Sequence, residues 1–207
     1  MKADTVAREL YWLLNKGSSD SYGTFVAKGA YWYNYLCGIE PITNVMELDC
    51  VSMDVGKIQN GLSWFVRQRG DCRVAQLQYW DSQIRAAFKV EFNDTSSMFM
   101  VFHRKKEING SNLVYFDKMV GYNPDTLLKQ ATKAYDKSNE VTDLYVMLME
   151  LEYNRQDLTD KTVAKALGVL RDRGAGQLQR AERHYVNMYN KSNWYRDIAE
   201  ILAKMGR

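Results

Sequence analysis

Few side chains in this sequence belong to the types on which catalysis usually depends. The only histidines are His103 and His184, too few for most zinc sites and for acid–base catalysis by paired imidazoles. Glycine-rich phosphate loops, H-E-x-x-H and G-x-S-x-G are all missing. The three cysteines form no C-x-x-C pair, so we expect them to be packing residues without a chemical role. We expect the protein to reside in a reducing, cytoplasmic compartment. We therefore expect no cofactor and no bound metal.

One carboxylate-bearing segment is the strongest indication of catalysis. In ELDCVSMDVGKIQNG (residues 47–61), Asp54 closes an apolar run, and two glycines precede the next one. The segment resembles the first-strand motif of RuvC and related RNase H-like nucleases, in which an aspartate binds Mg²⁺. That resemblance implies several carboxylates at one sheet edge, because two metal ions cleave the phosphodiester. The candidates are Asp49, Asp54, Glu91 and Asp160. The alternative is a hairpin loop in which Asp54 is a turn residue.

A second segment carries residues suited to reading nucleic acid. Residues 159–186 resemble a helix-turn-helix, with Ala164 allowing close helix crossing and Gly168 making the turn. Arginine and glutamine bind purine edges through paired hydrogen bonds, and arginines in the turn can hold phosphates. The residues assigned to this surface are Arg171, Arg173, Gln177, Arg180 and Arg183. The alternative is an ordinary helical hairpin with a solvated basic face.

Two further basic groups flank expected turns of the sheet. Basic side chains beside aromatic rings suit single-stranded nucleic acid, through phosphate attraction and base stacking. The basic residues are Arg67, Arg69, Arg73, Arg104, Lys105 and Lys106, and the rings are Trp64, Tyr79 and Trp80. Charged hairpin tips also keep sheet edges from associating, which is the alternative interpretation.

The elements that position these residues change in type along the chain. Apolar spacings of three and four predict two helices in the first 40 residues. From residue 43 to 121, apolar runs alternate with short turn-rich connections, which favours antiparallel neighbours. The runs are 45–53, 62–68, 73–80, 87–92, 98–108 and 113–120, with the clearest hairpin turn at EINGSN. The pattern predicts a six-strand antiparallel meander.

From residue 124 the spacing of apolar residues is again helical. Pro124 and Ser138 mark helix starts, and three further amphipathic stretches follow. We expect an α+β fold with N-terminal helices, a central antiparallel β-meander of about six strands and a C-terminal bundle of about five helices. Residues 1–122 would form one domain and residues 123–207 a helical subdomain packed on it, or the two would be continuous.

Composition points to binding surfaces. Aromatic residues make up 13% of the chain, with 14 Tyr and five Trp, which suit surfaces where a partner docks. The run YWYNYL predicts a protein interface at Tyr31, Trp32 and Tyr35. Residues 155–207 contain 11 Lys/Arg against six Asp/Glu, whereas residues 1–154 contain 17 against 19. The basic excess favours an acidic partner at the C-terminal helices.

The sequence as a whole favours binding over catalysis. We expect a non-enzymatic accessory protein, of the phage or mobile-element type, that contacts nucleic acid through its basic C-terminal helices and hairpin tips. The alternative is a protein–protein interaction module, either an inhibitor or an assembly subunit, which could also form a homo-oligomer. A Mg²⁺-dependent RNase H-like nuclease is a minor alternative. No apolar stretch reaches about 18 residues, so no membrane association is expected.

Overall fold

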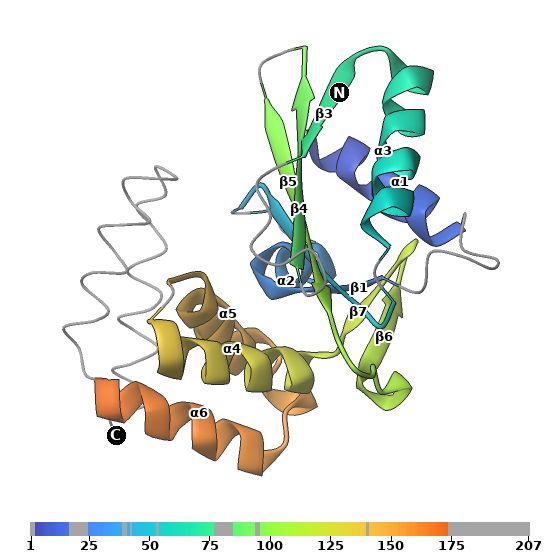
Figure 1. The fold of residues 1–207 in the computed structure, drawn as a ribbon. Coiled ribbons are helices and arrows are strands. Elements are labelled where there is room, and N and C mark those ends of the chain that lie inside the picture. The colour runs from blue at the N-terminus through green and yellow to red at the C-terminus, as the bar shows by residue number, and fades with distance from the viewer. Residues whose placement is uncertain are drawn as a thin grey trace. The chain divides into compact units, whose positions relative to one another are not determined.

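The computed structural model divides the chain into two compact units, Met1–Tyr122 (unit 1) and Asn123–Arg207 (unit 2). It describes residues 3–16, 25–38, 41, 43–52, 54–76, 85–93, 96–139 and 141–173. Figure 1 shows the elements in these ranges. None of the helices in these ranges is long and apolar enough to cross a membrane.

Unit 1 is built around one mixed sheet. Within the described residues, seven strands take the order β3-β4-β5-β2-β1-β7-β6 (Figure 1). The β5/β2 and β1/β7 pairs are parallel and the other neighbours are antiparallel. The elements of unit 1 are α1 (Ala3–Lys16), β1 (Val26–Lys28), α2 (Gly29–Leu36), β2 (Val45–Cys50), α3 (Val55–Arg69), β3 (Cys72–Gln76), β4 (Arg85–Phe92), β5 (Ser97–Arg104), the 3₁₀ turn η2 (Gly110–Asn112), β6 (Leu113–Phe116) and β7 (Met119–Tyr122).

The predicted six-strand antiparallel meander with a C-terminal five-helix bundle is therefore wrong. The described residues form an α+β fold with seven strands in a mixed sheet and six α-helices. Residues 98–108 and 113–120 do not pair through EINGSN, because β2, β1 and β7 lie between β5 and β6. Residues 113–120 instead form the β6/β7 hairpin, which turns at Asp117 with a φ of 54°. Short connections do not require pairing when the chain crosses to another part of the sheet.

Residues 62–68, predicted as a strand, lie in helix α3. Asp54 caps its start by accepting a hydrogen bond from the Lys57 amide at 3.0 Å. Gly70, with a φ of 72°, ends it in the left-handed conformation. The buried side chains Ile58, Leu62 and Phe65 recur at helical spacing. The valine and aromatic residues of this segment are also common in strands, but both helix ends are specified by capping residues.

Helix α2 follows β1 with no intervening loop. Ala27 and Gly121 are register partners, so a side chain at either position lies on the same face of the sheet. A Cβ atom at Gly121 would overlap the Trp32 indole, whose Nε1 donates to the Tyr122 carbonyl at 2.8 Å. Helix α2 therefore covers the Gly121 face, and the residues that alternate with Ala27 and Gly121 lie on the opposite face.

The core of unit 1 is rich in aromatic rings. Phe102 packs edge-on against Phe25 and Phe88, with ring centroids 5.3 and 5.9 Å apart. The Tyr11 hydroxyl, on α1, donates to the Phe25 carbonyl at 2.6 Å and accepts from the Val120 amide at 3.1 Å. These contacts join α1 to Phe25, which directly precedes β1, and to β7, two segments that are far apart in the sequence.

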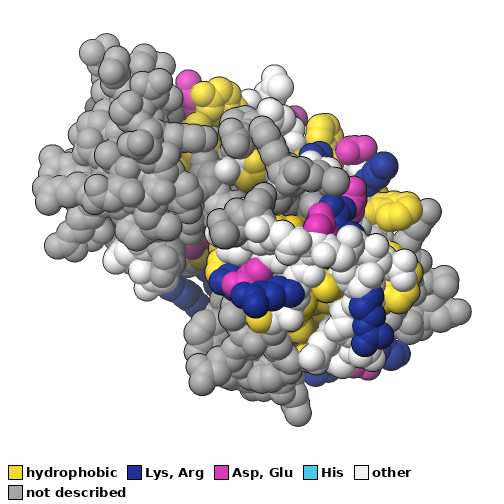
Figure 2. All heavy atoms as spheres, turned by 90° about the horizontal axis from the view of Figure 1, so that it is seen from above, with side chains coloured by type: hydrophobic (Ala, Val, Ile, Leu, Met, Phe, Trp, Pro, Cys, Tyr) yellow, Lys and Arg dark blue, Asp and Glu magenta, His cyan; other side chains and the backbone are white. Residues whose placement is uncertain are grey.

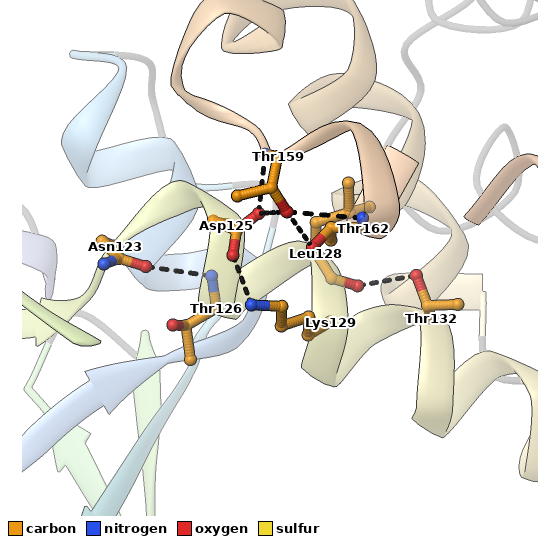
Figure 3. Close-up of polar contacts among 8 residues, drawn as sticks. All are labelled: Asn123, Asp125, Thr126, Leu128, Lys129, Thr132, Thr159 and Thr162. Carbon is orange, nitrogen blue, oxygen red and sulfur yellow. Dashed lines mark hydrogen bonds and ion pairs between the residues drawn. The ribbon is translucent and has the colours of Figure 1, made fainter. Parts of the chain in front are cut away.

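Unit 2, in the described range, contains helices α4 (Pro124–Ser138), α5 (Val141–Tyr153) and α6 (Asp160–Arg173), with the 3₁₀ turn η3 (Arg155–Asp157). Asn123 caps α4 by accepting from the Thr126 amide at 2.9 Å. Asp125 accepts hydrogen bonds from the Thr159 amide and hydroxyl, at 3.0 and 3.1 Å, and pairs with Lys129 (Figure 3). This carboxylate joins the starts of α4 and α6.

Candidate functional site

A polar cluster lies on the sheet face opposite α2. Glu47 and Asp49 are two residues apart on β2, so both project to one face. Lys28 on β1 is the register partner of Glu47, and His103 on β5 is the register partner of Asp49. We call Lys28, Glu47, Asp49, His103, Lys105 and Tyr122 the Asp49 cluster. All six residues belong to unit 1.

Asp49 is the centre of this cluster and its side chain is fully buried. The Tyr122 hydroxyl donates to Oδ2 at 2.9 Å, and Lys105 Nζ lies 3.6 Å from the same oxygen. Lys28 Nζ lies 2.9 Å from Oδ1. Oδ1 accepts no hydrogen bond of acceptable angle, so its contact with Lys28 is an ion pair. A buried carboxylate needs such compensation, because desolvation disfavours an isolated charge.

Glu47 is the more accessible carboxylate, with a side chain 36% exposed. His103 Nε2 lies 3.4 Å from Glu47 Oε1 and is buried without a hydrogen bond of good geometry. A Cβ atom at Gly29 would overlap Glu47 Oε2, and Gly29 has a φ of 71°. Only glycine suits this position, because the backbone is left-handed and the Glu47 carboxylate takes up the space.

The β1–α2 junction brings a helix start to the same place. Lys28 is both the last residue of β1 and the N-cap of α2. The Lys28 side chain makes no capping hydrogen bond and no acidic residue lies in the first turn, while the Glu47 carboxylate lies beside Gly29. The first amides of a helix lack intrahelical acceptors and favour anions, phosphate groups included. The junction therefore places potential phosphate-binding groups beside two carboxylates.

The donor set of the cluster fits Mg²⁺. Within the described ranges, no group of three or more Asp, Glu, His or Cys residues is placed to hold a metal ion. Mg²⁺ characteristically binds through one or two carboxylates and completes its shell with water and substrate phosphates. Glu47 and Asp49 supply two hard oxygen ligands, and an ion at the buried Asp49 Oδ1 would have to replace the Lys28 ammonium that pairs with it.

Within unit 1, the carboxylates predicted from the RNase H-like resemblance do not gather. Asp49 lies in the cluster, but Asp54 follows β2 and caps α3. Glu91 lies on β4, beyond β5, and pairs with Arg73 and Lys89 at 2.7 and 2.6 Å. Asp160 belongs to unit 2, where it pairs with Arg155 at 3.1 Å. Helix α3 also takes the place of the strand expected after Asp54.

Sequence reasoning missed Lys28, Glu47 and Tyr122. The available signal was the E-L-D alternation in a strand, together with a Lys-Gly pair at a strand-to-helix transition.

The predicted nucleic-acid-binding residues of unit 1 lie at separate places. Arg67 is exposed on α3, while Arg69 pairs with Asp71 and Glu9 at 2.9 and 2.6 Å. Arg73, with an 80% exposed side chain, pairs with Glu91 on the adjacent strand. On the face shown in Figure 2, Lys and Arg lie in small groups beside Asp and Glu rather than in one continuous patch. Arg104, Lys105 and Lys106 are exposed at the end of β5, next to the Asp49 cluster.

The predicted helix-turn-helix lies partly outside the described residues. Arg171 is exposed on α6, which ends at Arg173. Gln177, Arg180 and Arg183 lie outside the described residues, as do Tyr79 and Trp80. Trp64 is 52% exposed on α3.

The residues predicted to form a protein interface are buried. Tyr31, Trp32 and Tyr35 are 1%, 0% and 9% exposed. The Tyr35 hydroxyl donates to Asp117 at 2.8 Å, and its ring packs edge-on against Phe116. These three rings belong to the core of unit 1 and not to its surface. Tyr35 in this run combines a buried ring with a hydroxyl that reaches a polar partner.

Comparison with known proteins identifies similar folds. No protein-family model and no curated protein matches the sequence. Two solved structures from Helicobacter pylori align with 99% of this chain, each with a TM-score of 0.61. One, described as JHP933, is 10% identical, and 92% of its chain is covered. The other, described as a "putative nucleotidyltransferase", is 11% identical with 96% covered. At these identities the likeness concerns the fold alone.

Proposed function

We propose that unit 1 catalyses nucleotidyl transfer from a nucleoside triphosphate to a hydroxyl group. The acceptor oxygen attacks the α-phosphorus and forms a new P–O bond. The bond to the β-phosphate oxygen breaks, pyrophosphate leaves, and the proton of the hydroxyl passes to water. The products are the nucleotidylated acceptor and pyrophosphate.

The observation that carries this proposal is the position of Glu47 and Asp49. The two carboxylates alternate on β2, and the register places Lys28 opposite Glu47 where α2 begins. Carboxylates suit Mg²⁺, and a lysine beside a helix start suits the phosphates that accompany it. Such a pairing fits a reaction in which a metal–nucleotide complex is the substrate.

The side chains have distinct roles in this scheme. Glu47 and Asp49 would hold Mg²⁺, which when bound neutralises phosphate charge and polarises the phosphorus centre. Tyr122 orients Asp49 through the 2.9 Å hydrogen bond to Oδ2, and His103 lies against Glu47. Gly29 leaves room for the Glu47 carboxylate beside the helix start. The H. pylori neighbour whose description provisionally assigns nucleotidyl transfer supports the proposal through its similar fold.

The proposal is tested with the full-length chain and α-³²P-labelled nucleoside triphosphates, each in turn. Acceptors would include RNA, DNA, protein and the chain itself, with Mg²⁺ or Mn²⁺, and release of pyrophosphate would be measured in parallel. We expect label transfer that Glu47→Gln and Asp49→Asn abolish. Glu91→Gln is the matched control, because Glu91 lies on the same sheet face but pairs with Arg73 and Lys89. Equal transfer by all three variants would contradict the proposal.

Nucleic-acid binding is a second candidate function, and one observation favours it. Arg104, Lys105 and Lys106 are exposed where β5 ends, and Lys105 reaches Asp49. A nucleic acid held there would lie next to the proposed reaction site. Its affinity should fall steeply between about 50 and 200 mM salt and weaken in a variant with these three residues changed to glutamine. A flat salt dependence, or unchanged affinity in that variant, would contradict this role.

A further inference from the structure

Lys28 occupies the position that a metal ion would need. Its Nζ lies 2.9 Å from Asp49 Oδ1, and its side chain is only 16% exposed. The other oxygen, Oδ2, is already held by the Tyr122 hydroxyl. Oδ1 is therefore the Asp49 oxygen available to a ligand, and Lys28 covers it.

A divalent cation cannot share Oδ1 with the ammonium group at this distance. Like charges a few ångströms apart repel strongly in a partly buried site, where water screens little. Metal binding must displace Lys28 from Asp49, and the displaced ammonium then needs another anion. Displacement without such an anion leaves a cation beside a metal ion, which opposes metal binding.

The structure places a phosphate site within reach of the displaced lysine. Lys28 is the N-cap of α2, so its backbone adjoins the amides at that helix start. A nucleoside triphosphate bound at these amides would present negative oxygens to the Lys28 ammonium. Lys105 is less suited to the same role, since its Nζ lies 3.6 Å from Oδ2 and its side chain is 44% exposed.

We infer that Lys28 couples metal binding to nucleotide binding. This inference rests on the proposed function. Without nucleotide, Lys28 pairs with Asp49 and keeps metal affinity low. With nucleotide, Lys28 pairs with the triphosphate, and Glu47 and Asp49 receive the metal ion. Because linkage is reciprocal, the metal raises nucleotide affinity by the same factor.

The experiment measures Mn²⁺ binding to the full chain by electron paramagnetic resonance, with and without non-hydrolysable triphosphate analogues of the four ribonucleosides. For the natural chain we expect the analogue to raise Mn²⁺ affinity at least about tenfold. In Lys28→Met, Mn²⁺ alone should bind at least about tenfold more tightly than to the natural chain, and the enhancement by nucleotide should shrink. Lys28→Arg keeps a cation and should retain the coupling.

Lys89→Met is the matched control. Lys89 also pairs with a carboxylate, Glu91 at 2.6 Å, and lies on the same sheet face two strands from β2. The Lys89→Met variant should bind Mn²⁺ as tightly as the natural chain does. Enhancement by the analogue in the natural chain does not by itself identify Lys28, because the bound phosphates also ligate the metal ion. The test is the difference between the natural chain and Lys28→Met, and Lys28→Gln provides the same comparison if Lys28→Met folds poorly.

The outcomes separate the two proposals. Mn²⁺ binding that Asp49→Asn removes, but that neither the analogue nor Lys28→Met strengthens, would overturn the coupling and leave the proposed function standing. No Mn²⁺ binding with nucleotide, in the natural chain or in Lys28→Met, would overturn both.

Discussion

Asp49 in unit 1 and Asp125 in unit 2 are both shielded carboxylates, but their partners differ in kind. Asp125 accepts from the Thr159 amide and hydroxyl and pairs with Lys129 one helical turn away. Asp49 contacts two lysines from other elements and a tyrosine hydroxyl. Backbone donors fixed by a helix start suit a permanent structural link. Ammonium groups on long side chains can be replaced by another cation, which suits a site that binds ligands.

The largest expected effect is on nucleotidyl transfer, which should depend on Asp49 but not on Asp125. Asp49→Asn should lower nucleotidyl transfer by about 100-fold or more, since a neutral amide is a poor metal ligand. Asp125→Asn should leave transfer unchanged, because its partners join α4 to α6. Transfer is measured with labelled nucleotide at saturating Mg²⁺. A similar loss in both variants would mean that Asp49 also acts through stability.

Glu150 sharpens the comparison, because it is a buried carboxylate that pairs with no cation among the described residues. It is 0% exposed, Oε2 accepts from Asn154 at 2.9 Å, and Oε1 has no hydrogen-bond partner. Burial raises the pKa of Glu150 to about 8, well above the ordinary 4.5. A raised pKa in the folded state means that stability decreases as pH rises from about 4.5 to 8.

Glu150→Gln should therefore stabilise the chain, by about 3 kcal/mol near pH 7 to 8 and very little near pH 5. The amide keeps the contact with Asn154 and carries no charge to desolvate. The measurement is the free energy of unfolding in urea, followed by circular dichroism at both pH values. Parallel pH profiles for the variant and the natural chain would show that folding does not raise the pKa of Glu150.

The same residues show how far the sequence predicts this structure. Pro124, followed by apolar residues at helical spacing, predicts a helix that the structure contains as α4. The apolar runs at residues 87–92 and 98–108 likewise predict strands, and the structure contains β4 and β5 there. The parallel pairing of β2 with β5 could not be predicted, because it joins segments separated by α3 and two other strands. Local composition contains no information on that pairing.

The candidate site was predictable only in part, for a related reason. Asp49 was a candidate Mg²⁺ ligand from the sequence, but its partners depend on the pairing of β1 with β2. Strand β1 has three residues and runs directly into α2, so its pattern merges with that of a helix. The position of Lys28 opposite Glu47 follows from sheet register, which is set by long-range packing.

A smaller effect concerns Asp125 and its dependence on pH. Burial alone would raise the pKa of Asp125, but hydrogen bonds from Lys129, Thr159 and Thr162 outweigh it and lower the pKa to about 2. A lowered pKa in the folded state means that this stabilisation is complete above the unfolded value of 3.8. It is lost as pH falls from about 4 to 2.

Asp125→Asn should cost about 2 kcal/mol of unfolding free energy at pH 6 and almost nothing at pH 2. Thr159→Val provides the matched test, because it removes the hydroxyl donor and keeps the amide donor. It should cost about 1 kcal/mol at pH 6. Equal costs at both pH values would show that shape, rather than charge, links α4 to α6.

The smallest expected effect is at Asp160, which has a 96% exposed side chain and pairs with the half-exposed Arg155. Exposed pairs are screened by water and salt and stabilise proteins little. Asp160→Asn should change neither the unfolding midpoint nor nucleotidyl transfer, measured in the same assays as Asp49→Asn. Asp160 was a metal-ligand candidate on the same grounds as Asp49, so the two variants form a direct contrast. If Asp160→Asn lowered transfer as much as Asp49→Asn, the two carboxylates would share a site, and the distinction between a ligand-binding unit 1 and a structural network in unit 2 would fail.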